Sequence, residues 1–172
     1  MLRYSNMNNE KIIELVKPNF YSRFNNMHKK GSIVVYLKPL IELYKLCNEG
    51  ILPEFIKYIG SVVTNALELS KKNESQDPTI ISFIDLKGIY MSDLTTKTKK
   101  LIITIIQHLQ TAYVDVMDKM YIYNPPVFIR IGYKIFYNFI DPDTRKKIDI
   151  VYKNKQVINI NDLCNDNDNN KI

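Results

Sequence analysis

Apolar and polar positions follow one another along this chain in blocks that predict strands and helices in alternation. Residues 32–37 and 79–86 are short runs rich in β-branched and aromatic side chains, and the second is nearly continuous, as in strands covered on both faces. Between them, residues 53–72 place apolar side chains at helical spacing, with Pro53 in the first turn. Strands that alternate with helices in this way predict an α/β fold with a largely parallel sheet.

The same alternation continues toward the end of the chain. A helix is expected after a cap at Asp93 or Thr95 and should run to about residue 117, because its apolar side chains recur at helical spacing. Shorter elements complete the pattern: turns at 25–31 and 48–50, helices at 10–16 and 40–47, and strands at 120–123 and 146–152.

Residues 127–140 form the most unusual block. Prolines just before and just after it predict a helix of about four turns. Its polar side chains fall on one narrow stripe, and its other positions divide into two apolar faces. The stripe comprises Arg130, Lys134 and Asn138; one face comprises Phe128, Ile131, Ile135 and Phe139, and the other Ile129, Tyr133, Phe136 and Ile140. Such a helix either lies in the middle of a core or closes over an apolar ligand.

Several short motifs occur in a fixed order along residues 79–151. They read Ile84-Asp85-Leu86-Lys87-Gly88, Tyr113-Val114-Asp115, Asn124-Pro125-Pro126 and Asp141-Pro142-Asp143-Thr144-Arg145-Lys146-Lys147-Ile148. In order and spacing, this part of the chain resembles the CRAL-TRIO (Sec14-like) family of lipid-binding domains. The resemblance implies a CRAL-TRIO-like α/β fold in which helices flank the sheet, the sheet forms the floor of a lipid pocket, and residues 127–140 are the gate helix.

The resemblance also indicates which side chains would line such a pocket. Strand alternation aims Ser82 and Ile84 to the same face of the sheet. The expected lining residues from the sheet and the gate helix are Ser82, Ile84, Met120, Ile122, Ile129, Tyr133 and Phe136. The alternative is that the four sheet positions belong to an ordinary core.

A headgroup site follows from the same resemblance. Relatives that bind phosphoinositides use an acidic residue and a lysine at positions that match Asp115 and Lys147. An ammonium group neutralises a phosphate, and a carboxylate accepts hydrogen bonds from inositol hydroxyls. Here Val114 stands where the family motif has proline, and Asp115 is a shorter carboxylate than the family's glutamate. The alternative is a solvated surface pair.

Two cations on the gate helix predict contact with a membrane. Arg130 and Lys134 are like charges at i and i+4, which is mildly unfavourable unless an anionic surface compensates. Gly132 lies mid-helix, where glycine is less stable than alanine and a static core helix gains nothing from it. Both features favour a gate that docks transiently on an anionic leaflet.

Composition fits one domain in a reduced compartment. The 172 residues are 45% hydrophobic, enough to bury a core, and carry a formal net charge of +6. We expect a disordered N-terminus at 1–9, one domain at 10–160 and an acidic, Asn-rich tail at 161–172. Cys47 and Cys164 match no ligand spacing, which favours ordinary thiols in a cytoplasmic, peripheral membrane protein. No leader is visible and no apolar run approaches the length of a membrane span.

Other function classes find little support in the sequence. Basic residues form no extended run of the kind that nucleic-acid readers carry, so no nucleic acid is expected as a partner. The two histidines, His28 and His108, match neither a metal site nor a catalytic constellation, and Gly-x-Ser-x-Gly and Gly-rich phosphate loops are absent. Asp85, at a strand end, is expected to fix the following turn. We therefore expect no enzyme, no metal and no cofactor other than a bound lipid.

The sequence thus predicts a protein that binds a single hydrophobic lipid, with a phosphoinositide or other phospholipid favoured. It would transfer this lipid between membranes or present it to another protein. The alternative is a protein-interaction module of the same fold that transfers no lipid, for example one that contacts a small GTPase or its regulator.

Overall fold

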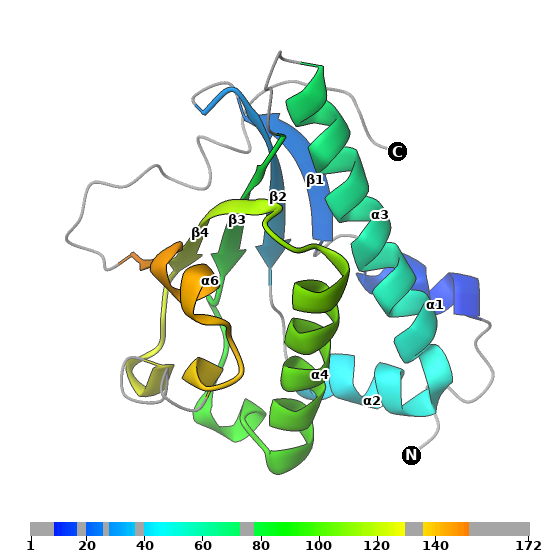
Figure 1. Cartoon of the computed structure of the whole chain (residues 1–172). Coiled ribbons are helices and arrows are strands. Elements are labelled where there is room, and N and C mark those ends of the chain that lie inside the picture. Colours follow the sequence, from blue (N-terminus) through cyan, green and yellow to red (C-terminus); the bar gives the residue numbers. More distant parts are fainter. Residues whose placement is uncertain are drawn as a thin grey trace.

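The structure, a computed structural model, describes residues 9–16, 20–25, 28–36, 40–72, 78–129 and 136–151. Five strands form one sheet in the order β1-β2-β3-β4-β5, and helices pack beside it (Figure 1). The strands are β1 (Phe20–Asn25), β2 (Lys30–Tyr36), β3 (Ile80–Asp85), β4 (Met117–Tyr123) and β5 (Ile148–Ile150). The helices are α1 (Asn9–Val16), α2 (Leu40–Leu46), α3 (Leu52–Lys71), α4 (Thr96–Ala112) and α6 (Pro142–Lys146), with short turns η2 (Cys47–Ile51) and η3 (Met91–Asp93).

The sheet is largely parallel, which confirms the predicted fold class. Strands β2, β3, β4 and β5 are parallel neighbours, and only β1 is antiparallel, to β2. Each parallel connection passes through a helical segment: α3 between β2 and β3, α4 between β3 and β4, and α6 before β5. The carboxyl ends of β2, β3 and β4 therefore share one edge of the sheet.

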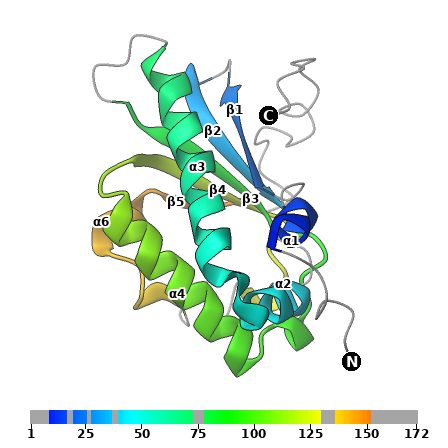
Figure 2. The same cartoon turned by 90° about the vertical axis from the view of Figure 1, so that its right-hand side faces the viewer.

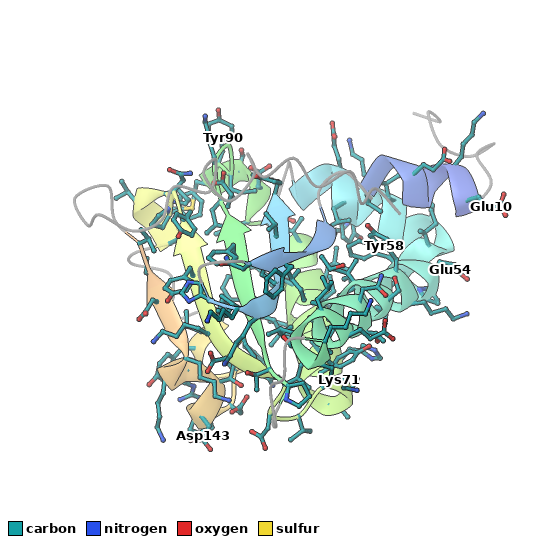
Figure 3. The ribbon with its side chains drawn as sticks, turned by 90° about the horizontal axis from the view of Figure 1, so that it is seen from above. Glu10, Glu54, Tyr58, Lys71, Tyr90 and Asp143 are labelled. Carbon is teal, nitrogen blue, oxygen red and sulfur yellow. The ribbon has the colours of Figure 1, made fainter. Side chains whose placement is uncertain are left out.

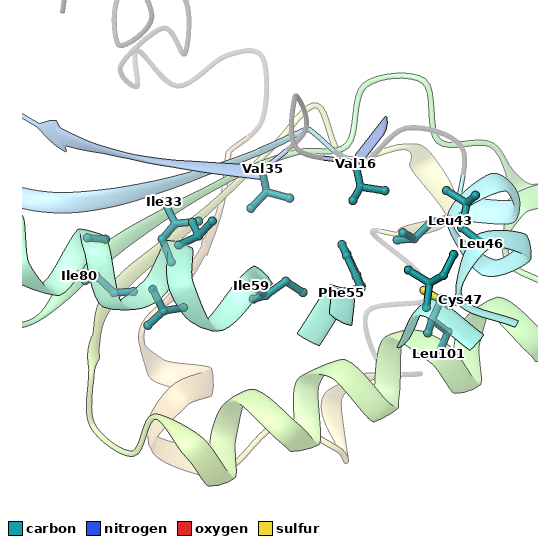
Figure 4. Packing of buried hydrophobic residues seen from close by; sticks show 14 residues of the cluster. Val16, Ile33, Val35, Leu43, Leu46, Cys47, Phe55, Ile59, Ile80 and Leu101 are labelled. Atoms are coloured by element: carbon teal, nitrogen blue, oxygen red, sulfur yellow. The ribbon is translucent and has the colours of Figure 1, made fainter. Parts of the chain in front are cut away.

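Helices α3 and α4 cover the same face of this sheet (Figures 1 and 2). The main core lies between them and the strands, where Phe55 of α3 is almost fully buried (Figure 4). Ala66 of α3 is also fully buried. Its other buried members come from α1, β2, α2, η2, α3, β3 and α4: Val16, Ile33, Val35, Leu43, Leu46, Cys47, Ile51, Ile59, Val62, Val63, Ile80 and Leu101.

The opposite face of the sheet carries a separate, aromatic cluster. Phe83 is fully buried there, and its ring stacks on Tyr121 at a centroid distance of 5.5 Å. The cluster contains Val34, Ile81, Phe83 and Tyr123, with Tyr36, Tyr121 and Val151 packed against it. Burial raises the pKa of Tyr123 to about 12, so its phenol is neutral at physiological pH.

Strand β1 was not predicted. Its Phe20 packs edge-on against Phe55 of α3, with ring centroids 5.3 Å apart. The turn that follows is held by Asn25, whose side-chain oxygen accepts a hydrogen bond from the backbone N–H of His28 at 3.1 Å. The turn expected at 25–31 is therefore narrower, and β2 begins at Lys30 rather than at residue 32.

One expected helix end is confirmed and another differs. Helix α2 ends at Leu46, and Gly50 has non-helical backbone angles (φ 100°) in the π-helical turn η2, which leads directly into α3. Helix α4 is capped by Thr95, whose side chain accepts from the N–H of Thr98, but it ends at Ala112 rather than near residue 117. The short helix α6 was not predicted. Its sequence does carry helix-start signals: Asp141 is the N-cap residue and Pro142 is the first helical residue.

Candidate functional site

An apolar cluster lies at the carboxyl edge of the sheet, and we call it the edge cluster. Its buried members are Leu86, Ile89 and Ile129. Packed against them are Ile84, Leu94, Ile102, Ile122 and Phe128. These side chains come from the ends of β3 and β4, the loop after β3, helix α4 and the residues that follow β4. Three of the predicted pocket residues, Ile84, Ile122 and Ile129, therefore meet here.

The parallel register of β3 and β4 explains how the sheet contributes to this cluster. Ser82 lies opposite Met120 and Ile84 opposite Ile122, so all four side chains share one face. That face is the one covered by α3 and α4, since Ile84 also packs against the main core. Ser82 is buried and Met120 half-buried, one strand repeat further from the carboxyl edge. The predicted floor residues thus form one continuous strip.

The start of the predicted gate segment is tied to the end of β3. One carboxylate oxygen of Asp85 accepts two hydrogen bonds, from the backbone N–H of Lys87 and from the side-chain amide of Asn124, each at 2.8 Å. Asp85 therefore fixes the following turn, as predicted, and also joins this turn to the chain after β4. Asn124 adopts a left-handed conformation (φ 48°), which asparagine tolerates better than most residues.

The far end of the segment is tied to helix α4. The side-chain amide of Gln110 donates to the carbonyl of Phe139 at 3.2 Å, and its oxygen accepts from the N–H of Asp141 at 3.1 Å. Arg145 adds a hydrogen bond from Nε to the carbonyl of Ile140 at 2.6 Å and places its guanidinium over the ring of Tyr137, 4.0 Å from the centroid. The far end is thus anchored by Gln110 and Arg145, in roles that the sequence analysis did not assign to them.

The predicted gate helix is described only at its two ends. Residues 127–129 and 136–137 are helical, with Ile129 buried and Phe136 half-buried. Three of the predicted site residues, Arg130, Tyr133 and Lys134, lie outside the described residues. Of the predicted polar stripe, Asn138 is exposed.

The predicted headgroup residues lie at the opposite, amino edge of the sheet. Asp115 is exposed and adopts a left-handed conformation (φ 55°) in the connection from α4 to β4. Lys147 is half-buried at the end of α6, directly before β5, and its carbonyl accepts from the N–H of Met120 at 2.9 Å. Because β4 and β5 are parallel neighbours, both residues precede their strands on the same edge. Within the described part of the chain, neither forms an ion pair.

A surface groove of about 580 Å³ separates α3 from α4. Its lining is largely apolar. Three lining residues have titratable side chains: Lys57, His108 and Tyr113. The complete lining is Leu52, Pro53, Ile56, Lys57, Gly60, His108 and Tyr113. This groove is separate from the edge cluster and from the predicted headgroup residues.

Reactive groups are few in the described residues. Burial raises the pKa of Cys47 to about 11, so its thiol is protonated and unreactive at neutral pH. The described residues contain no group of three or more His, Cys, Asp or Glu side chains arranged to hold a metal ion. Among the same residues, no helix combines the length and apolar character needed to span a bilayer.

The bond between Asp85 and Asn124 gives a first testable expectation. Asp85→Ala should lower the free energy of unfolding by about 1–3 kcal/mol, because it leaves the N–H of Lys87 and the amide of Asn124 without their acceptor. Urea denaturation followed by circular dichroism measures this change. Asp143→Ala is the matched control, since it removes a carboxylate whose partner, Lys146, is exposed. Equal stabilities of the two variants would contradict the anchoring role.

Comparisons with known proteins agree with this architecture. A family model described as the CRAL/TRIO domain matches residues 7–168. Among solved structures, the chain is similar to the crystal structure of Sfh5, with a TM-score of 0.65 and 19% sequence identity; the match covers 86% of this chain and 52% of that chain. The chain therefore spans about half the length of that protein, and the likeness concerns the fold alone. No curated protein sequence matches this chain.

Proposed function

This chain belongs to the CRAL-TRIO family, and we propose from that premise that it binds one hydrophobic lipid and transfers it between membranes or presents it to another protein. One observation carries the proposal: the apolar cluster at the carboxyl edge of the sheet includes Phe128 and Ile129. The chain on either side of the predicted gate is held by side-chain hydrogen bonds, at Asn124 to Asp85 and at Phe139 and Asp141 to Gln110. A phosphoinositide or another phospholipid is the favoured ligand.

The proposed mechanism is non-covalent. Each methylene group that leaves water for an apolar pocket contributes about 0.8 kcal/mol, which offsets the cost of removing a lipid from a bilayer. The strip of Ser82, Ile84, Met120 and Ile122 would form the floor of the pocket. The segment 125–141 would move about its two anchors, at Asn124 and at Gln110, to admit acyl chains, with Tyr133 and Phe136 contributing apolar surface.

An anionic membrane would favour the open state of this segment. Arg130 and Lys134 would meet anionic headgroups, and each cation near such a surface contributes about 1 kcal/mol. A ligand shifts a conformational equilibrium only through its preference for one state, and the membrane would supply that preference. The protein would then act as a cytoplasmic, peripheral membrane protein without catalytic activity.

The headgroup would be held at the amino edge by Asp115 and Lys147. Lys147→Glu should weaken binding of phosphatidylinositol phosphate about tenfold, because it replaces a charge-assisted contact with a repulsive one. Transfer of a labelled phosphoinositide between vesicles measures the effect. The control is Lys146→Glu, since Lys146 is exposed and already paired with Asp143 at 2.8 Å. Equal transfer by both variants would refute the headgroup assignment while leaving lipid binding open.

A protein-interaction module is the second candidate, and the groove between α3 and α4 favours it. Its largely apolar walls lie away from the edge cluster, so a partner could dock there without any lipid. A small GTPase or its regulator would be a partner of this kind. Purified protein that contains no lipid, and acquires none from vesicles, would favour this second function.

A further inference from the structure

A half-buried histidine packs on the aromatic cluster at the face of the sheet opposite α3 and α4. His28 lies in the turn between β1 and β2, and its ring contacts rings of two other strands. The ring centroids of His28 and Tyr121 are 6.3 Å apart with an interplanar angle of 29°, and those of His28 and Phe83 are 6.4 Å apart. The imidazole of His28 thus joins the turn to β3 and β4.

The turn that carries His28 lies at the amino edge of the sheet, because β2 begins directly after it. In Figure 3, Asp143 of α6 marks this edge, and Tyr90, which follows β3, marks the carboxyl edge. Strand β1 is held separately, by its pairing with β2 and by the contact of Phe20 with Phe55 of α3. A movement of His28 can therefore stay confined to the turn.

Two polar atoms of this turn are buried without a partner. Nε2 of His28 and Nδ2 of Asn25 are enclosed, and neither forms a hydrogen bond among the residues that the structure describes. Buried polar groups without partners are unfavourable by the free energy of their lost hydration. The turn gains one hydrogen bond in return, from the N–H of His28 to the side-chain oxygen of Asn25. The ring contacts of His28 are therefore a large part of what holds the turn in place.

A proton on this imidazole would find no unoccupied carboxylate nearby. Asp118, whose negative charge acts on His28, is already paired with Lys30 at 2.6 Å. The ammonium group of Lys30 also donates to the hydroxyl of Thr79 at 2.9 Å, which keeps this positive charge beside the turn. Protonated His28 would thus meet aromatic surface and a second cation.

Electrostatics at this position agree with the geometry. Burial lowers the pKa of His28 below its ordinary value of 6.5; among the weaker influences, Asp118 raises this pKa and Lys30 lowers it. The described charged or titratable residues of the strands around His28 are Lys30 of β2, Asp85 of β3, and Asp118, Lys119, Tyr121 and Tyr123 of β4. The neutral imidazole is therefore the form that the closed turn accommodates.

We propose that His28 is an acid-sensitive switch, which holds the turn between β1 and β2 against Phe83 and Tyr121 when neutral and releases it when protonated. In the released turn the imidazole is in water and takes up a proton near its ordinary pKa of 6.5, whereas the closed turn resists protonation. The closed turn is therefore fully favoured above about pH 6.5, and this advantage is lost as the pH falls below that value.

Release of the turn would remove packing from the back of β3 and β4. The other face of these two strands carries the strip of Ser82, Ile84, Met120 and Ile122. Acidification would therefore loosen the floor of the proposed lipid site and speed the loss of a bound lipid. This consequence rests on the proposed function, whereas the switch itself does not.

Amide hydrogen exchange of the full chain at pH 7 and pH 5, corrected for the intrinsic effect of pH on exchange, measures the switch. We expect protection of residues 28–30 to fall about tenfold at pH 5. His28→Phe keeps a ring on the aromatic cluster and cannot titrate, so its protection should be equal at both pH values. His108→Gln is the matched control, because His108 is the other histidine of the chain and is exposed on α4. This control should lose protection as the unmodified protein does.

A second measurement needs no variant at the switch. The imidazole resonances of His28, identified by their presence in His108→Gln, should titrate at lower pH than those of a histidine in an unstructured peptide. Titration at the same pH as in the peptide would overturn the switch. So would equal protection of the unmodified turn at pH 7 and pH 5, or an equal loss of protection in His28→Phe, which would assign the effect to another group.

The consequence for the lipid is tested separately. Protein loaded with labelled phosphatidylinositol should release it faster at pH 5 than at pH 7, and His28→Phe should show no such difference. Equal release at both pH values, with the expected loss of protection in the turn, would overturn the link between the switch and the lipid site. A chain that takes up no lipid would contradict the proposed function and leave the switch to the exchange data.

Discussion

Gly31→Ala is expected to prevent this chain from folding to its native state. A Cβ atom at Gly31 would lie 1.7 Å from the carbonyl oxygen of Ala66, which is backbone of α3 and cannot rotate away. Strand β2 would have to separate from α3, and the hydrogen bond from the N–H of Gly31 to the hydroxyl of Ser70, 2.8 Å long, would be lost. The expected cost is about 4 kcal/mol or more, a large part of the stability of a domain this size.

Soluble yield and urea denaturation followed by circular dichroism measure this effect. Gly60→Ala is the matched control. A Cβ there would lie 2.7 Å from the hydroxyl of Tyr113, which is the end of a side chain that can shift, and alanine is the better helix former. Gly60→Ala should therefore change stability by about 1 kcal/mol at most. A Gly31→Ala protein that unfolds at the same urea concentration as the unmodified chain would contradict the close packing of β2 on α3.

Ile129→Asp is the second change with a large expected effect. Its outcome distinguishes between two interpretations of residues 127–140: a mobile gate helix and an ordinary core helix. Ile129 is 9% exposed in the edge cluster, where an ionised carboxylate is unfavourable by several kcal/mol. If the segment 125–141 is a closing element, it relieves this cost by detaching while the rest of the domain stays folded. New proteolytic cleavage between residues 124 and 141 is then expected, together with a loss of lipid uptake of about tenfold or more.

The control for this change is Val127→Asp, two residues earlier on the same segment and 69% exposed. Limited proteolysis of the free protein should leave Val127→Asp as resistant as the unmodified chain. Global unfolding of Ile129→Asp, seen as one cooperative loss of helical signal, would show that the segment is an integral part of the core. That outcome would favour the ordinary-core interpretation of residues 127–140.

The order of elements was predictable because it depends on local periodicity. The runs at 32–37 and 79–86 and the amphipathic helix at 53–72 correspond closely to β2, β3 and α3. Strand β1 was missed because its identity depends on pairing with β2 and on the contact of Phe20 with Phe55, neither of which its six residues encode alone. Helix α4 ends at Ala112, earlier than expected, because Tyr113 leaves the helical conformation (φ −132°, ψ 59°). Helical spacing of apolar residues alone does not indicate this end.

The apolar residues of the candidate site could be predicted from the sequence. The hydrogen bonds that hold the neighbouring chain could not. Strand alternation and register bring Ile84 and Ile122 to one face, where they meet Ile129, which the sequence analysis also named. The anchors at Asn124 and Gln110 bridge 39 and 29 residues of sequence, respectively, and amide side chains carry no periodic signal that would indicate such partners. Long-range hydrogen bonds of this kind become visible only once the sheet and α4 are in place.

Native mass spectrometry of gently purified protein, with identification of whatever dissociates, tests the central claim most directly. Our account predicts one lipid molecule per chain, and a phospholipid would select the headgroup hypothesis at Lys147 for the next test. A mass equal to that of the chain alone, unchanged after incubation with mixed liposomes, would contradict lipid binding and favour a protein-interaction domain.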